Sequence, residues 1–279
     1  MDISEQLVHT TVRIEGRDGN GAAHSGTGFF FEFRVNATTT APVIVTNRHV
    51  LEGMRSIIFH LTTANPDRTP NYGRHERIQV NELGQNVMFH PDSSVDLALF
   101  FVAGVFKVLT DQGKSPFWRS VGEDQLPTEQ LLSSLTSFED ILLIGYPSGL
   151  WDSTNNLPLM RRGYTATPFA RDFEGRREFV IDAACFPGSS GSPVYLFNQG
   201  TFRTADGSIT TGSRIGLLGI LWGGPQITVQ GEIIVSAIPT AMQNVAIPIL
   251  RFPSHLGYCI KSSRLLDFAP AIRERAAKG

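Results

Sequence analysis

The sequence lacks the features of several protein classes. It contains no uninterrupted run of 18 apolar residues, so a membrane-spanning helix is excluded. Two cysteines, Cys185 and Cys259, are too few for a disulfide scaffold. The formal net charge of −2 argues against a nucleic-acid binder that works through a strong positive field. The first residues, Met1–Glu5, do not begin a basic region followed by an apolar stretch, so we expect no secretory signal and a cytoplasmic protein.

The 279 residues are 41% hydrophobic, which is enough chain for two cores of about 100–150 residues each. The 27 glycines, 16 prolines and 19 phenylalanines favour many short strands joined by turns over a helical bundle. Strand-like runs recur along both halves: Val8–Ile14, Ser25–Phe33, Pro42–Asn47, Ser56–Leu61, Arg77–Val80, Leu97–Val102, Ile141–Tyr146, Tyr164–Thr167, Glu178–Ala183, Ser192–Phe197, Ile215–Trp222 and Glu232–Ile238.

Between the two sets of strands the character of the chain changes. A helix-like piece, Pro127–Leu135, has proline at its start and an acid in its first turn. The end of the chain also permits helix, with an interruption or restart at Pro270. We therefore predict an all-β fold in four parts, namely an N-terminal β lobe 1–115, a linker 116–140 with a short helix, a C-terminal β lobe 141–250 and a tail 251–279 that is helical.

The most specific motif is Gly188-Ser189-Ser190-Gly191-Ser192-Pro193, a serine between two glycines ahead of a strand. Such a loop lets the backbone approach a substrate carbonyl closely while the amides of Gly188 and Ser190 point at one spot, where an oxyanion develops. The structural alternative is an ordinary turn rich in Gly and Ser.

Two further residues fit this chemistry. His49 follows the apolar strand that ends at Thr46, and histidine is the side chain suited to general-base work near neutral pH. Asp96 precedes the hydrophobic run Leu97–Leu99, where a partly buried carboxylate needs a partner such as an imidazole N–H. Asp92 is a nearby competitor for that role, and six other histidines compete with His49.

At these residues the sequence resembles the trypsin-like, chymotrypsin-fold serine peptidases. The chain order His49, Asp96, Ser190 is that of the family. The motifs Gly145-Tyr146-Pro147 and Ile220–Gly224 look like those of its bacterial glutamyl-endopeptidase and Deg-type branch. The resemblance implies two antiparallel six-stranded β-barrels with a short helical linker and a C-terminal helix.

The resemblance also implies roles. Ser190 attacks the scissile carbonyl, His49 moves the proton, and Asp96 orients the imidazole. The amides of Gly188 and Ser190 form the oxyanion hole, with the amide of Ser189 turned away. The implied reaction is hydrolysis of peptide bonds through an acyl-enzyme, with a polypeptide as substrate.

The same resemblance places a side-chain pocket in two segments. Ala184 stands where trypsins carry an acid, and Leu221 stands where glutamyl endopeptidases carry a histidine, so a preference for a basic or a glutamyl residue is not expected. We predict an apolar pocket that accepts a hydrophobic or small residue before the scissile bond, although a shift of the loop would bring Asp182 nearer. The predicted pocket residues are Ala184, Cys185, Pro187, Leu221, Trp222 and Gly223.

Activation differs from that of secreted trypsins, in which a new N-terminal amine pairs with an Asp just before the catalytic serine. That position is Ser189 here, so we expect a loop that is preformed or ordered by an activating protein partner.

Two other functions stay open, namely a silent peptide-binding module and a partner-activated effector protease with one protein target. We expect no metal or cofactor, because no Cys/His cluster has ligand spacing, and no membrane partner. The basic pairs Arg161-Arg162 and Arg176-Arg177 are expected to be solvated or salt-bridged rather than to bind nucleic acid.

Overall fold

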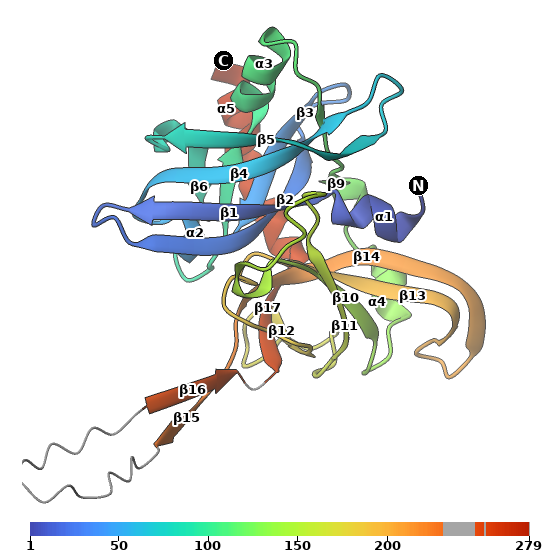
Figure 1. The fold of residues 1–279 in the computed structure, drawn as a ribbon. Coiled ribbons are helices and arrows are strands. Elements are labelled where there is room, and N and C mark those ends of the chain that lie inside the picture. The colour runs from blue at the N-terminus through green and yellow to red at the C-terminus, as the bar shows by residue number, and fades with distance from the viewer. Residues whose placement is uncertain (231–248, 254, 279) are drawn as a thin grey trace, which may run out of the picture.

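The computed structural model describes residues 1–230, 249–253 and 255–278. The chain is mostly β, with two large antiparallel sheets and few helices. The sheet of the N-terminal half lies above the sheet of the C-terminal half in Figure 1, and the C-terminal helix returns to the first half. The prediction that both halves of the chain are rich in β-strands is therefore confirmed.

The first sheet has nine strands in the order β5-β4-β1-β2-β3-β7-β6, with β8 added to β4 and β9 added in parallel to β2. Its strand β2 is buried on both faces, because Phe29, Phe31 and Phe33 point into one cluster and Phe30 into another, as the two-residue period of a strand requires. The strands are β1 Thr11–Asp18, β2 Ala23–Arg34, β3 Thr40–Thr46, β4 Met54–Ala64, β5 Pro70–Asn81, β6 Val87–Phe89, β7 Ala98–Phe101, β8 Pro116–Phe117 and β9 Val121–Gly122.

The second sheet is a closed six-stranded barrel in the order β10-β11-β12-β17-β14-β13. Its strands are β10 Asp140–Gly145, β11 Leu159–Thr165, β12 Glu178–Asp182, β13 Pro193–Arg203, β14 Ile209–Gly223 and β17 Leu256–Lys261. The prediction of two six-stranded barrels is thus not confirmed. In the described chain the first sheet has nine strands, and no pairing joins its end strands β5 and β6.

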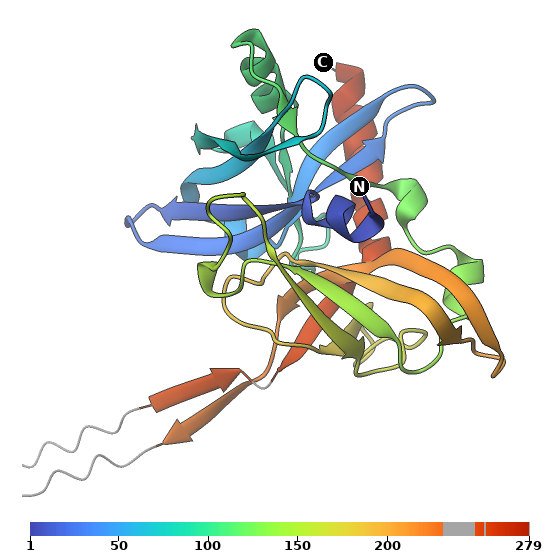
Figure 2. The same ribbon diagram turned by 45° about the vertical axis from the view of Figure 1, so that its right-hand side comes forward.

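The sequence boundary at residue 250 is also corrected. Strand β17 lies in the segment expected to be a helical tail, yet it pairs with both β12 and β14 and closes the barrel. A second pair of strands, β15 Gln226–Gln230 and β16 Ile249–Pro253, forms a separate two-stranded ribbon that extends away from both lobes in Figure 2. The predicted strand Glu232–Ile238 lies outside the described residues.

The helices are short. The linker helix α4 covers Glu129–Ser133, and Thr128 caps it by accepting a hydrogen bond from the amide of Leu131. Helix α3 was not expected from the sequence. The helical segments are α1 Ile3–Val8, α2 Arg48–Leu51, α3 Ala103–Asp111, α5 Ala269–Lys278, and the 3₁₀ turns η1 Gly84–Asn86, η2 Glu123–Gln125, η3 Pro147–Gly149 and η4 Ser262–Phe268. No helix in the described ranges is both long and apolar enough to cross a membrane.

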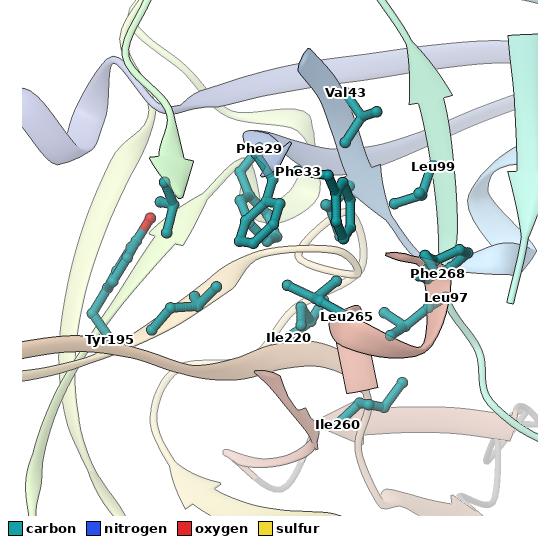
Figure 3. Packing of buried hydrophobic residues seen from close by; sticks show 14 of the residues in the cluster. Phe29, Phe33, Val43, Leu97, Leu99, Tyr195, Ile220, Ile260, Leu265 and Phe268 are labelled. Carbon is teal, nitrogen blue, oxygen red and sulfur yellow. The ribbon is translucent and has the colours of Figure 1, made fainter. Parts of the chain in front are cut away.

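One hydrophobic cluster joins the two sheets and the C-terminal segment. Figure 3 shows Phe29 and Phe33 of β2 facing the barrel residue Ile220, with Leu265 and Phe268 of η4 between the lobes. All five side chains are buried. Because this core is shared, its packing holds the two lobes in one orientation relative to each other.

Candidate active site

Strand pairing brings His49 and Asp96 together. Strands β3 and β7 are neighbours, with Thr46 opposite Ala98, so the residues that follow β3 meet those that precede β7. His49 lies in α2 directly after β3, and its Nδ1 is 2.6 Å from Oδ2 of Asp96. The backbone amide of His49 donates to Oδ1 of the same carboxylate at 3.0 Å. Nδ2 of Asn47 donates to the carbonyl oxygen of Asp96 at 2.7 Å, which holds the backbone of that loop.

These contacts determine which imidazole nitrogen carries the proton. An ionised carboxylate only accepts hydrogen bonds, so Nδ1 of His49 is the donor and Nε2 keeps its lone pair when the ring is neutral. The His49 side chain is 49% exposed, and within the described residues no group is hydrogen-bonded to its Nε2. The pair is therefore arranged to accept a proton at Nε2 while Asp96 stabilises the charged ring.

The competitors for these roles have other partners. Asp92 accepts hydrogen bonds from the hydroxyl and the amide of Ser94 and pairs with Arg264 at 2.9 Å. His90 also has a carboxylate partner, Asp267 at 3.2 Å, but its side chain is only 1% exposed. Because no substrate atom reaches a ring that is so buried, this second His–Asp pair serves to hold the C-terminal segment against the loop before β7.

The Ser190 loop connects β12 to β13 and needs its glycines. Gly188 has φ +83°, and a Cβ there would lie 2.7 Å from the carbonyl oxygen of Tyr146. The amide of Ser189 donates back to Phe186, and that of Ser192 donates to Ser189, each at 3.0 Å. Within the described chain the amides of Gly188 and Ser190 donate to no protein acceptor. The loop thus presents two free donors, with the intervening amide turned away.

Thr27 of β2 links this loop to the first lobe. Its amide donates to the carbonyl of Ser190 at 2.8 Å, and its hydroxyl donates to the carbonyl of Gly188 at 2.9 Å. The carbonyl of Thr27 accepts from the hydroxyl of Thr46, the last residue before the turn that carries His49, at 2.7 Å. Ser190 and His49 therefore lie on either side of the same short stretch of β2.

The structure does not join Ser190 to His49. Oγ of Ser190 is 3.5 Å from the carbonyl oxygen of Trp222, and no hydrogen bond between Ser190 and His49 is present among the described residues. Such contacts are often long in the absence of substrate. The observed site is thus a His49–Asp96 pair facing a separately anchored serine loop.

Gly191 packs tightly against Thr27 of β2, where the serine loop meets the first lobe. Its φ is +88°, and a Cβ there would overlap the carbonyl oxygen of Thr27. We expect Gly191→Ala to lower the free energy of unfolding by about 2–5 kcal/mol, from a left-handed backbone cost of about 1–2 and an overpacking cost of about 1–3. Urea unfolding measures this.

Gly207 in the β13–β14 turn is the matched control. Its φ is +85°, but no atom lies within 4 Å of the added Cβ. Gly207→Ala should therefore lose only the backbone cost of about 1–2 kcal/mol. If both variants lost the same free energy of unfolding, the contact between Gly191 and Thr27 would have to tolerate the extra methyl group.

A cavity of about 190 Å³ adjoins Ser190. Of the predicted pocket residues, Cys185, Pro187, Leu221 and Gly223 line it, together with Phe186, Gly224, Pro225 and Leu256. Two predicted residues do not line it. The carbonyl of Ala184 accepts a hydrogen bond from Arg161, and the indole of Trp222 donates to Glu178 at 3.3 Å. Asp182 is exposed and is also outside the lining.

The sequence reasoning missed Leu256 for a physical reason. Gly224 and Pro225 directly follow Gly223 in the sequence, so they could have been predicted from their neighbours. Leu256 lines the pocket only because β17 lies beside β14. Four other cavities, of 310 to 640 Å³, are larger, and none of the four is lined by His49, Asp96 or Ser190.

The cysteine in the pocket wall is not a rival nucleophile. Burial raises the pKa of the Cys185 thiol to about 11, so it is protonated at neutral pH. Both cysteines are free and buried. In the part of the chain that the structure describes, no group of three or more His, Cys, Asp or Glu side chains is placed to hold a metal ion.

Comparison with known proteins gives one family match. The profile of the trypsin-like peptidase domain matches residues 26–202, a span that contains His49, Asp96 and Ser190. Among solved structures, an inactive serine-to-alanine form of the Rv3671c protease of M. tuberculosis is 16% identical with a TM-score of 0.46, over 97% of this chain and 89% of that one. The active form is 16% identical with a TM-score of 0.45, over 96% of this chain and 82% of that one. No curated protein matches the sequence.

Proposed function

The chain belongs to the family of trypsin-like peptidase domains, and we propose that it is a serine endopeptidase whose machinery is Ser190, His49 and Asp96. The observation that carries this proposal is the double contact of one carboxylate with one histidine. Asp96 accepts from Nδ1 of His49 at 2.6 Å and from its backbone amide at 3.0 Å, which leaves Nε2 as the base.

In the proposed reaction Oγ of Ser190 forms a bond to the carbonyl carbon of the substrate, and its proton passes to Nε2 of His49. The carbonyl oxygen becomes an oxyanion that the amides of Gly188 and Ser190 stabilise. The C–N bond then breaks as His49 returns the proton to the leaving nitrogen, which gives an acyl-enzyme. His49 then takes a proton from water as the water oxygen bonds to the acyl carbon. The ester bond to Oγ of Ser190 breaks as His49 returns the proton to Oγ, which releases the acid.

The proposed preference is for a hydrophobic or small residue before the scissile bond. Among the residues that line the cavity beside Ser190, none is charged, and Leu221 and Leu256 form apolar walls. Burying an apolar side chain in such a cavity contributes about 1.5–3 kcal/mol. A carboxylate or ammonium group would lose its hydration there without gaining a charged partner in the lining.

We further propose that the chain lies on the glutamyl-endopeptidase and Deg-type branch, which the motifs Gly145-Tyr146-Pro147 and Ile220–Gly224 support. The substrate would be a polypeptide. A partner that switches the enzyme on is part of this proposal as the alternative to a preformed site, since Oγ of Ser190 lies 3.5 Å from the carbonyl oxygen of Trp222 and makes no hydrogen bond to His49 among the described residues.

A fluorophosphonate probe tests the proposal. Incubation of the full-length protein should add one phosphonyl group, and mass spectrometry of the digested protein should locate it on Ser190. The matched control is Ser192→Ala, since Ser192 lies two residues away in the same loop and should leave the labelling intact. A folded protein that remains unlabelled, with and without peptide substrate, would favour the silent peptide-binding module.

A further inference from the structure

Arg161 occupies an unusual position beneath the serine loop. It lies on β11 opposite Leu143 of β10, and its side chain turns under the segment between β12 and β13. Nη1 of the guanidinium donates to the carbonyl of Ala184 at 2.6 Å and to Oγ of Ser189 at 2.9 Å. The neighbouring Arg162 is exposed and pairs with Asp140, as expected for a surface basic pair, so only Arg161 departs from the sequence prediction.

The charge of Arg161 has no carboxylate partner in the described chain. Its Nε and Nη2 atoms are buried and have no hydrogen-bond partner. Burial lowers the pKa of the guanidinium to about 10, so it is still charged at neutral pH. By contrast, the buried Arg214 is neutralised by Glu139 at 2.8 Å. Burying an uncompensated cation is costly, and an aliphatic side chain in its place would avoid that cost.

The two acceptors of Arg161 lie at the two ends of one short segment. Ala184 precedes the pocket wall, and Ser189 stands between the two residues whose amides form the free donor pair. Ser189 is 1% exposed, and within the described residues Arg161 is the only partner of its hydroxyl. The amide of Ser190 lies in the peptide plane that directly follows Ser189. The amide of Gly188 lies in the plane that joins Pro187 to Gly188, which is inside the segment that the two contacts of Arg161 hold at its ends.

We propose that Arg161 is a positioning residue that holds the 184–189 segment in the conformation in which the amides of Gly188 and Ser190 face the substrate. This inference rests on the proposed function. An internal cation orders the oxyanion loop, so the loop needs no newly cleaved N-terminus. The guanidinium does not line the cavity beside Ser190, and its hydrogen bonds go to Ser189 and Ala184, so it acts through these two residues.

The kinetic test compares Arg161→Met with Arg161→Lys and the neighbouring control Arg162→Met. Arg161→Met should lower kcat by about 10²–10³, the loss typical of a missing oxyanion donor, with KM within a few-fold of wild type. Arg161→Lys keeps the charge and a donor and should recover at least ten-fold of that loss. Arg162→Met should retain full activity. If Arg161→Met instead keeps kcat, or changes only KM for one class of side chain before the scissile bond, the positioning role is wrong.

Hydrogen exchange in a Ser190→Ala background separates this inference from the proposed function. No version of that protein turns over, so the readout does not depend on activity. Adding Arg161→Met should speed amide exchange at Ser189, Gly191 and Ser192, whose hydrogen bonds hold the loop, while the barrel strands remain protected. Unchanged exchange in this segment would overturn the positioning role. Should Arg161→Met fail to fold, the same comparison is made with Arg161→Lys, for which a smaller acceleration is expected.

Discussion

Replacing His49 with alanine is expected to lower kcat by about 10⁶. The ring binds Asp96 through Nδ1, and within the described chain no group is hydrogen-bonded to its Nε2. Without it, Ser190 has no base to accept its proton, and the leaving nitrogen has no acid. Losses of this size are typical when one member of such a catalytic unit is removed. Steady-state cleavage of a peptide substrate, with active-site titration, measures the effect.

The matched control for His49 is His24. Its side chain is 47% exposed, close to the 49% of His49, and its Nε2 pairs with Asp18 at 3.3 Å. It lies on β2 and is paired with Asp18 rather than with Asp96 or Ser190, so His24→Ala should change kcat less than two-fold. If His49→Ala kept more than a hundredth of the wild-type kcat, another group would have to be the base, and the proposed mechanism would be wrong.

Asp96→Asn is expected to lower kcat by about 10⁴. The carboxylate now accepts from both Nδ1 and the backbone amide of His49. An asparagine offers one acceptor oxygen and one donor NH₂, so one of the two His49 groups would face a donor. If the NH₂ meets Nδ1, the ring adopts the tautomer with its proton on Nε2 and cannot accept the proton of Ser190. The folded structure should persist, since the side chain keeps its size.

Asp92→Asn is the control for a carboxylate in the same loop. Hydrogen bonds from Ser94, with Arg264 nearby, lower the pKa of Asp92 to about 2. Because the folded-state pKa is depressed, the stabilisation is present above the ordinary pKa and is lost as pH falls toward 2. Asp92→Asn should therefore keep kcat and lose some stability at pH 7, and the difference should vanish near pH 2. Equal losses of kcat at positions 92 and 96 would argue against a specific role for Asp96.

Local patterns explain which parts of the site could be predicted. His49 and Asp96 each stand at the end of a strong β run, and the pairing of β3 with β7 then carries them to hydrogen-bond distance. The Ser190 loop follows from Gly188 and Gly191, whose positive φ values only glycine adopts without strain. Part of the pocket could be predicted, because Cys185, Pro187, Leu221 and Gly223 lie in the same two sequence segments as these motifs.

Arg161 shows why the rest could not be predicted. The local sequence does not distinguish Arg161 from Arg162. The alternation of side chains along β11, however, turns Arg161 inward and Arg162 to solvent. The predicted strand Tyr164–Thr167 began after Arg161, so this alternation was not visible. The role of β17 was missed for a similar reason, since a strand that closes a barrel is defined by its two neighbours rather than by its own residues.

The sequence by itself determined the β-rich character of both halves, the glycine-dependent turns of the Ser190 loop and the order in which His49, Asp96 and Ser190 occur. These properties depend on side-chain period and backbone freedom, which act over a few residues. Only the tertiary structure decided that the first sheet has nine strands, that Leu256 and Arg161 meet the serine loop, and that Phe268 enters a core shared by both lobes. Those contacts join residues far apart in the chain, and burial between lobes selects them.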